Sequence, residues 1–112
     1  MEAEENKEKW ALQCINLNIY TSFTLGVCER VVKNRMDGNT DRKVLDMLVA
    51  AITVRDHWRA QALMLEDVLP ELDGDLRELV GTGLAGYHQV DDVLLETKEL
   101  VADKLPNGAT VH

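Results

Sequence analysis

Two turn signals divide this chain of 112 residues into three segments of nearly equal length. Gly38, in "MDGNTDRK", stands where a glycine commonly ends a helix, because glycine adopts positive φ angles without a steric cost. Asp73-Gly74, in "PELDGDLREL", is a second turn signal. The segments between them cover about residues 5–36, 41–69 and 75–104, so we expect three long elements joined by short connections.

The second and third segments have the period of amphipathic helices, because their apolar residues recur at steps of three and four. In the second segment these residues are Val44, Met47, Ala51, Val54, Trp58, Ala62 and Leu65. In the third they are Leu76, Val80, Gly83, Tyr87, Val90, Leu94 and Val101. We therefore predict two long helices.

The first segment allows two interpretations. In "INLNIYTSFTLGV", residues 15–27, apolar and polar residues largely alternate, which is typical of a half-buried strand. A helical face also runs from Trp10 through Leu17 to Val31, the flanking sequences favour helix, and no other part of the chain offers a strand to pair with. We favour a helix.

Three long helices joined by short turns predict an all-α fold, an antiparallel bundle in a single domain of residues 1–104, followed by a disordered tail of residues 105–112. The second helix carries a further apolar strip that its main face does not use, formed by Leu45, Leu48, Val49 and Ile52. An exposed strip of this kind implies a second contact surface. We therefore expect a homodimer to complete the bundle.

The formal net charge of −8 is concentrated at the carboxyl end, where residues 70–112 hold nine acids and three bases. Such a surface repels nucleic acid and anionic membranes, since binding to either requires clustered Lys and Arg. A protein partner fits better, with Asp91, Asp92 and Glu96 as candidate contacts. The amino terminus lacks the pattern of a secretory signal and no apolar run could span a membrane, so we expect a cytoplasmic protein.

A glycine motif in "VGTGLAGYHQVDD" has the spacing of a dinucleotide-binding turn, with Gly81, Gly83 and Gly86. That fold places a buried strand before the first glycine and a second strand after the helix, and the sequence offers neither. We interpret the glycines as a helix-packing patch on which a large side chain lies. When the chain is folded about its two turns, Tyr20, Trp58 and Gly86 come level, so Trp58 is the expected occupant.

Two histidines suggest an alternative function. His57, in mid-helix, resembles the phosphoacceptor of a histidine phosphotransfer bundle, but Ala60 and Gln61 stand where that family has Lys and Gly. His88 has Asp91 three residues on, which could supply half of a metal site. Neither arrangement forms a complete catalytic or metal-binding set, and we predict no cofactor, metal or catalytic residue.

The sequence thus favours a small acidic helical module that works by binding a protein partner as a homodimer. A bacterial adaptor, secretion chaperone or immunity-type inhibitor would have this composition. The alternative is a phosphotransfer-like or metal-binding helical domain that uses His57, or His88 with Asp91.

Overall fold

The computed structural model describes residues 2–39 and 41–105, and all of the regular elements in these residues are helices. The elements are α1 (Glu2–Met36), α2 (Arg42–Thr53), α3 (Arg55–Val68), the 3₁₀ helix η1 (Leu69–Glu71), α4 (Gly74–Leu100) and the 3₁₀ helix η2 (Ala102–Lys104). The all-helical prediction is confirmed, including the helix over residues 15–27.

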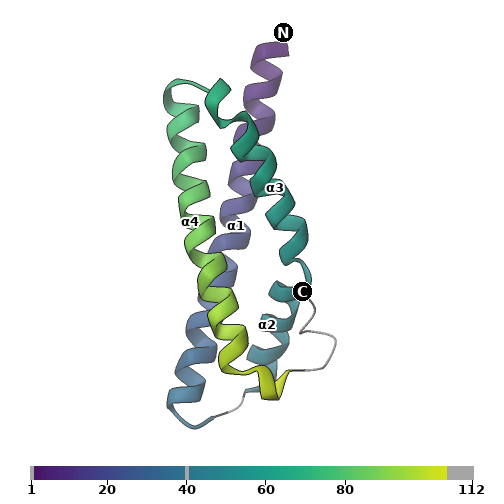
Figure 1. Cartoon of the computed structure of the whole chain (residues 1–112), viewed down its shortest axis with the longest axis vertical. Helices are drawn as coiled ribbons and strands as arrows, with labels where there is room; N and C mark the ends of the chain where they lie inside the picture. Colours follow the sequence, from purple (N-terminus) through teal and green to yellow (C-terminus); the bar gives the residue numbers. More distant parts are fainter. Residues whose placement is uncertain (1, 40, 106–112) are drawn as a thin grey trace.

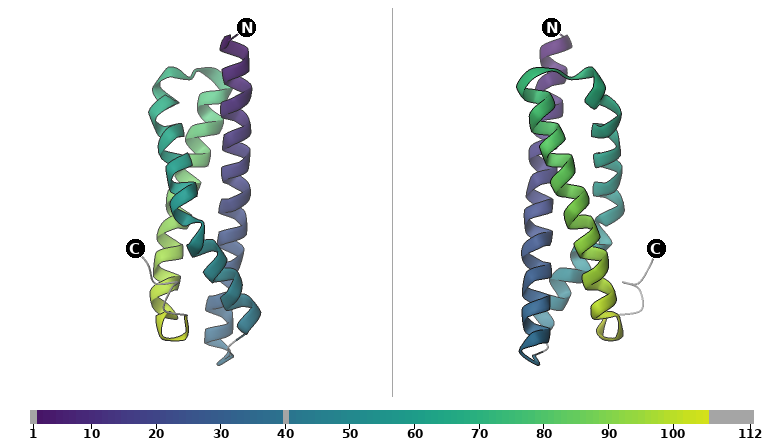
Figure 2. Two further views of the ribbon diagram at one scale, coloured as in Figure 1. Left: turned by 90° about the vertical axis from the view of Figure 1, so that its right-hand side faces the viewer. Right: turned by 60° about the vertical axis from the view of Figure 1, so that its left-hand side comes forward.

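The helices run along the length of an elongated molecule measuring 54 × 25 × 19 Å. Helix α1 descends from the amino terminus, α2 and then α3 return beside it, and α4 descends again, in the same direction as α1 (Figure 1, Figure 2). The connections after α1 and after α3 each reverse the direction of the chain, as expected for sequential helices in a bundle.

The first turn ends α1 in the way that its glycine predicts. Gly38 has a φ of 74°, and its N–H donates to the carbonyl of Arg35 over 3.1 Å. The N–H of Asn39 donates to the carbonyl of Asn34 over 2.8 Å. These two bonds form a Schellman motif, which satisfies carbonyls that the end of a helix would otherwise leave free.

The segment predicted as one helix over residues 41–69 is two helices, so the prediction of three long helices is wrong on this point. Val54 interrupts the segment with φ −95° and ψ 3°. The hydroxyl of Thr53 donates to the carbonyl of Val49 over 2.7 Å, a side-chain bond that commonly bends helices. The bend sends α2 and α3 to different parts of the core.

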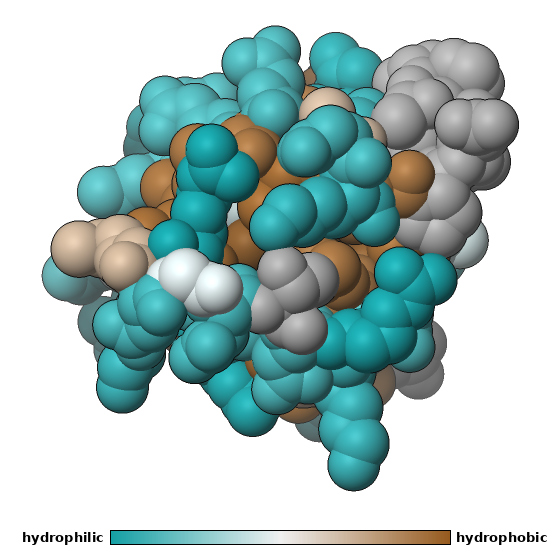
Figure 3. Space-filling model, turned by 90° about the horizontal axis from the view of Figure 1, so that it is seen from below, coloured by the Kyte–Doolittle hydropathy of each residue, from teal (hydrophilic) through white to brown (hydrophobic). Residues whose placement is uncertain are grey.

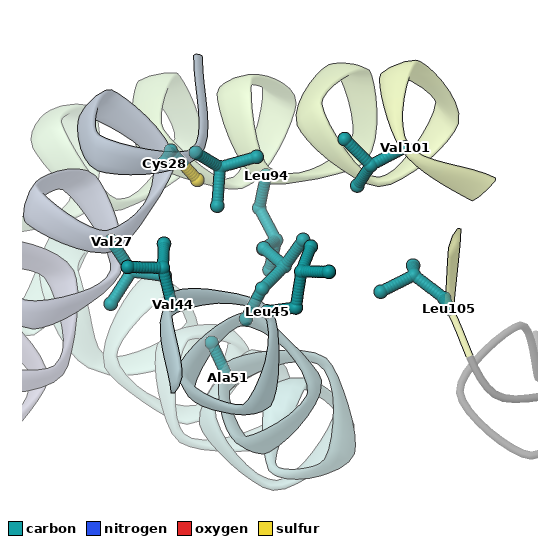
Figure 4. Close-up of a cluster of buried hydrophobic side chains, with 10 residues drawn as sticks. Val27, Cys28, Val44, Leu45, Ala51, Leu94, Val101 and Leu105 are labelled. Atoms are coloured by element: carbon teal, nitrogen blue, oxygen red, sulfur yellow. The ribbon is translucent and has the colours of Figure 1, made fainter. Parts of the chain in front are cut away.

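The core consists of two hydrophobic clusters, one for each of these helices. The cluster beside α2 joins residues of α1, α2 and α4 with two residues that follow α4 (Figure 4). Its members are Val27, Cys28, Val31, Val44, Leu45, Leu48, Ala51, Leu94, Val101 and Leu105. The cluster beside α3 contains Cys14, Leu17, Tyr20, Ala62, Leu65, Val80, Leu84 and Tyr87. Viewed along the bundle from the end where α1 meets α2, hydrophilic side chains largely surround apolar ones (Figure 3).

Leu105 corrects the predicted boundary of the tail. Its side chain is buried against the α2 cluster, so the packed region extends past residue 104. The rest of the predicted tail, residues 106–112, lies outside the described residues.

Candidate interaction surface

The glycine motif lies within α4, as the prediction of a helix over residues 81–86 requires. A Cβ atom on Gly83 would stand 2.8 Å from Sγ of Cys14 and 3.0 Å from Oδ1 of Asn18, both on α1. A Cβ atom on Gly81 or Gly86 would meet nothing within 4 Å. Only Gly83 therefore serves as a packing position, and its partner is α1.

Trp58 does not occupy the glycine patch, and this part of the prediction is wrong. Its ring stacks on Tyr20 instead, with centroids 5.3 Å apart and an interplanar angle of 16°. The expectation that Tyr20 and Trp58 lie level is confirmed. Tyr20 is held by a hydrogen bond that its hydroxyl donates to the carbonyl of Ala51 over 3.3 Å, and its ring centroid lies 6.5 Å from that of Tyr87 on α4.

The prediction that the second helix exposes a free apolar strip is also wrong. Leu45 and Leu48 are buried in the α2 cluster, and Val49 and Ile52 pack against that cluster half-buried. The bend at Val54 gives α2 its own orientation, in which the strip faces the core rather than solvent. Burial removes Leu45 and Leu48 from the surface, and Val49 and Ile52 keep only part of their side chains exposed.

The acidic candidates on α4 differ in availability. Asp91 accepts two hydrogen bonds from Arg55 of α3, over 2.7 and 2.8 Å, and both side chains are largely buried. The paired carboxylate, acting as a hydrogen-bond acceptor, raises the pKa of Arg55. Asp92 and Glu96 are exposed. Only these two of the predicted acidic contacts can meet a partner.

The histidines are not brought together with the groups that the alternative function needs. His57 is exposed and stands edge-on to Trp58. His88 pairs with Glu66 of α3, while Asp91 is held by Arg55, so the structure does not bring His88 and Asp91 together. Among the residues that the structure describes, no three His, Cys, Asp or Glu side chains are placed to hold a metal ion.

Two kinds of buried group, thiols and phenols, could titrate but are held neutral. Cys14 and Cys28 are free thiols, and burial raises the pKa of both. Burial likewise raises the pKa of Tyr20 and of Tyr87, and the Asp91 carboxylate adds to the shift of Tyr87. Reactive thiols require the opposite shift, so these cysteines have the character of core residues.

The largest feature that the sequence analysis missed is an exposed apolar face on α1. It consists of Leu12, Ile15, Ile19 and Phe23, whose exposed fractions are 59%, 48%, 64% and 43%. At 100° per residue these four side chains share one side of the helix, away from Cys14 and Leu17 in the core. We call this surface the outer apolar face.

A lack of charged residues was the sequence signal for this face. Residues 10–28 contain no Asp, Glu, Lys, Arg or His, although charged residues make up 29% of the chain. A helix side that faces water normally carries charge, so an uncharged run this long indicates that both sides of α1 are apolar. The alternation in "INLNIYTSFTLGV" arises from these two apolar sides and not from a strand.

Two open grooves lie along α1. One, of about 430 Å³, borders the outer apolar face and is lined by Asn16, Ile19, Tyr20, Phe23 and Trp58. The other, of about 370 Å³, lies on the α4 side and is lined by Cys28, Glu29, Val32, Lys33, Met36, Asp37 and Val93. The first joins the outer apolar face to α3 and widens the exposed apolar surface.

No helix within residues 2–39 and 41–105 has the length and apolar character needed to cross a bilayer. Comparison with known protein families, with curated proteins and with solved structures finds no significant match.

Proposed function

We propose that this chain is a small acidic protein-interaction module of the adaptor, chaperone or inhibitor type, which works by binding and not by catalysis, and which acts as a homodimer. The observation that carries the proposal is the outer apolar face of α1. Contiguous exposed apolar surface marks interaction sites in soluble proteins. The cores of such sites are also depleted in charged residues, as residues 10–28 are.

The charge of the chain supports a protein partner. With a net charge of −8, the chain repels phosphate backbones and anionic lipid at long range. Exposed Asp92 and Glu96 add negative charge on α4, and charges at the rim of an interface act chiefly on the rate of association. A basic protein partner would be steered toward this molecule.

The histidine-based alternative is not carried forward. The form that uses His57 lacks the Lys and Gly of the phosphotransfer family, with Ala60 and Gln61 in their places. The form that uses His88 with Asp91 requires an imidazole free to react and a carboxylate free to assist it. Glu66 engages His88, and Arg55 engages Asp91, so the groups are committed to contacts between α3 and α4. These contacts join α3 to α4 and keep His88 apart from Asp91.

Photocrosslinking in the native cell tests the proposal. A photoreactive amino acid is placed at Ile19, in the outer apolar face, and at Ala60, an exposed position of α3 outside it. We expect protein adducts at position 19 and few at position 60. Equal labelling at both positions, or none at position 19, would contradict a protein interface on α1.

A further inference from the structure

Helix α1 has a face that is symmetric about Ile19. Residues that lie 4, 7 and 11 positions to either side of Ile19 differ from it in direction by about 40°, 20° and 20°, so all of them share its side of the helix. These pairs are Ile15 with Phe23, Leu12 with Gly26, and Glu8 with Arg30. The pairs join two large apolar residues, a leucine and a glycine, and an acid and a base, in that order.

We infer that the outer apolar face binds α1 of a second copy of this chain, antiparallel, with the two-fold axis beside Ile19. This inference rests on the proposed function, and it names the partner and its orientation. In an antiparallel pair centred on Ile19, each residue meets the one equally far on the other side of the centre. Ile19 then meets the partner subunit's Ile19, and Ile15 meets the partner subunit's Phe23.

Gly26 is explained by this pairing and by nothing within one chain. It lies in the middle of α1, where glycine weakens a helix, and a Cβ atom there would meet nothing within 4 Å. Its backbone is exposed beside the outer apolar face. In the antiparallel pair Leu12 of the other copy, itself 59% exposed, lies over this position, and the missing side chain makes room for it.

The charges at the two ends of the face decide the direction. Glu8 and Arg30 are both exposed, and they are the first charged residues met on this side of α1 beyond the uncharged run. Antiparallel pairing brings each Glu8 to an Arg30 of the other copy, twice. Parallel pairing would place like charges opposite each other and would leave Gly26 facing the partner subunit's Gly26.

Sedimentation of purified full-length protein at low ionic strength, with charge-swapped variants, tests the inference. We expect the wild type to be a dimer. Glu8→Arg and Arg30→Glu should each raise the dimer Kd by about tenfold or more, because like charges then meet twice. The double variant should return to within about threefold of the wild type, because each opposite-charge pair is restored with reversed sign. In a parallel dimer like charges would face each other at positions 8 and 30 in the wild type and in each single variant, so neither single swap would raise the dimer Kd.

Two matched variants separate loss of pairing from loss of folding. Ile19→Asp should give a folded monomer by circular dichroism, and Leu63→Asp, at an apolar position on α3 that is 48% exposed, should remain a dimer. Engineered cysteines then report orientation: Leu12→Cys mixed with Gly26→Cys should form a disulfide between chains. Leu12→Cys alone should not, because position 12 of one chain and position 12 of the other would lie about 21 Å apart along the helix axis.

The outcomes distinguish this inference from the proposed function. A monomeric wild type, or a dimer whose Kd no charge swap or Ile19→Asp changes, overturns the antiparallel pairing. If that monomer still forms adducts with another protein at Ile19 in cells, the interaction function stands with a different partner. If Ile19 forms no adducts either, both fail.

Discussion

Sγ of Cys14 lies 2.8 Å from the position that a Cβ atom on Gly83 would occupy. Oδ1 of Asn18 lies 3.0 Å from the same position, so two side chains that are one turn apart on α1 cover Gly83. The backbone of α4 can approach α1 at this level only because residue 83 has no side chain. The glycine of the apparent nucleotide motif is thus a contact between the first and last helices of the bundle.

Substitution of Gly83 by Ala should destabilise the protein. Ala favours helix over Gly by up to about 1 kcal/mol, but the added methyl group enters a closed contact, and overpacking of this kind costs about 1–3 kcal/mol. We expect the free energy of unfolding to fall by about 1 kcal/mol in urea titrations.

Gly81→Ala and Gly86→Ala are the matched controls, because a Cβ atom at either position meets nothing within 4 Å. Each should raise the free energy of unfolding by about 0.5–1 kcal/mol through helix propensity. A stabilising Gly83→Ala, equal to its two controls, would show that α1 does not close on residue 83.

The ion pair between Arg55 and Asp91 should couple the two residues energetically. Both side chains are about 15% exposed or less, and the two parallel hydrogen bonds fix the pair in one geometry. Removal of one partner leaves the other charge poorly solvated, so Asp91→Ala should lower the free energy of unfolding by about 2–3 kcal/mol. A double-mutant cycle with Arg55→Ala should give a coupling energy of about 1–3 kcal/mol.

The pair between Arg42 and Asp46 serves as the control for that cycle. Its atoms are 3.8 Å apart and its side chains are 68% and 67% exposed, so its coupling should be no more than about 0.5 kcal/mol. Equal coupling energies for the two pairs would mean that burial of Arg55 and Asp91 does not strengthen their interaction.

The sequence predicted the helices better than the directions in which they face. Gly38 marked the end of α1 correctly, because the positive φ of a Schellman motif is a local requirement. The break at Val54 was not foreseen, because it falls within a continuous apolar pattern and no Gly or Pro marks it. Once α2 turns there, Leu45 and Leu48 face the core.

The surface was harder to predict for the same reason. Helix α1 has apolar residues on two sides, and periodicity alone does not state which side the rest of the chain covers. Asp91 looked like one of several surface acids because its partner, Arg55, is 36 residues away in the sequence. Charge depletion over residues 10–28 was the one local signal that both sides of α1 are apolar.

Leu48 and Ile19 should separate stability from association. Leu48 is fully buried and Ile19 is 64% exposed. Leu48→Ala should therefore lower the free energy of unfolding by about 2–5 kcal/mol, the range for a large core residue. Ile19→Ala should change the unfolding of the isolated chain by about 0.5 kcal/mol or less. Urea titrations at protein concentrations below the dimer Kd measure both. A larger loss of unfolding free energy for Ile19→Ala would contradict the position of Ile19 on the surface of the isolated chain.

Stability should fall at alkaline pH, and Tyr87 should account for part of the loss. Burial raises the pKa of Tyr87 above the ordinary value of 10.0, as it does for Tyr20. The unfolded chain releases these phenol protons near pH 10, while the folded chain retains them. The stabilisation is therefore complete below pH 10 and is lost as the pH rises from there toward the folded-state pKa values. The buried thiols add to the same loss, starting nearer pH 9 because their ordinary value is 9.0.

Tyr87→Phe isolates the contribution of one phenol. The hydroxyl of Tyr87 is buried without a hydrogen-bond partner among the described residues, so its removal should leave the protein equally stable or more stable at pH 7. Above pH 10 the variant should lose stability less steeply than the wild type, by up to about 1.4 kcal/mol per pH unit, which is the share of one titrating group. Urea titrations from pH 7 to 11 give the two slopes, and absorbance at 295 nm follows ionisation of the two tyrosines. Parallel slopes for variant and wild type would show that Tyr87 titrates alike in the folded and unfolded chains. Its phenol would then not be buried in the folded chain.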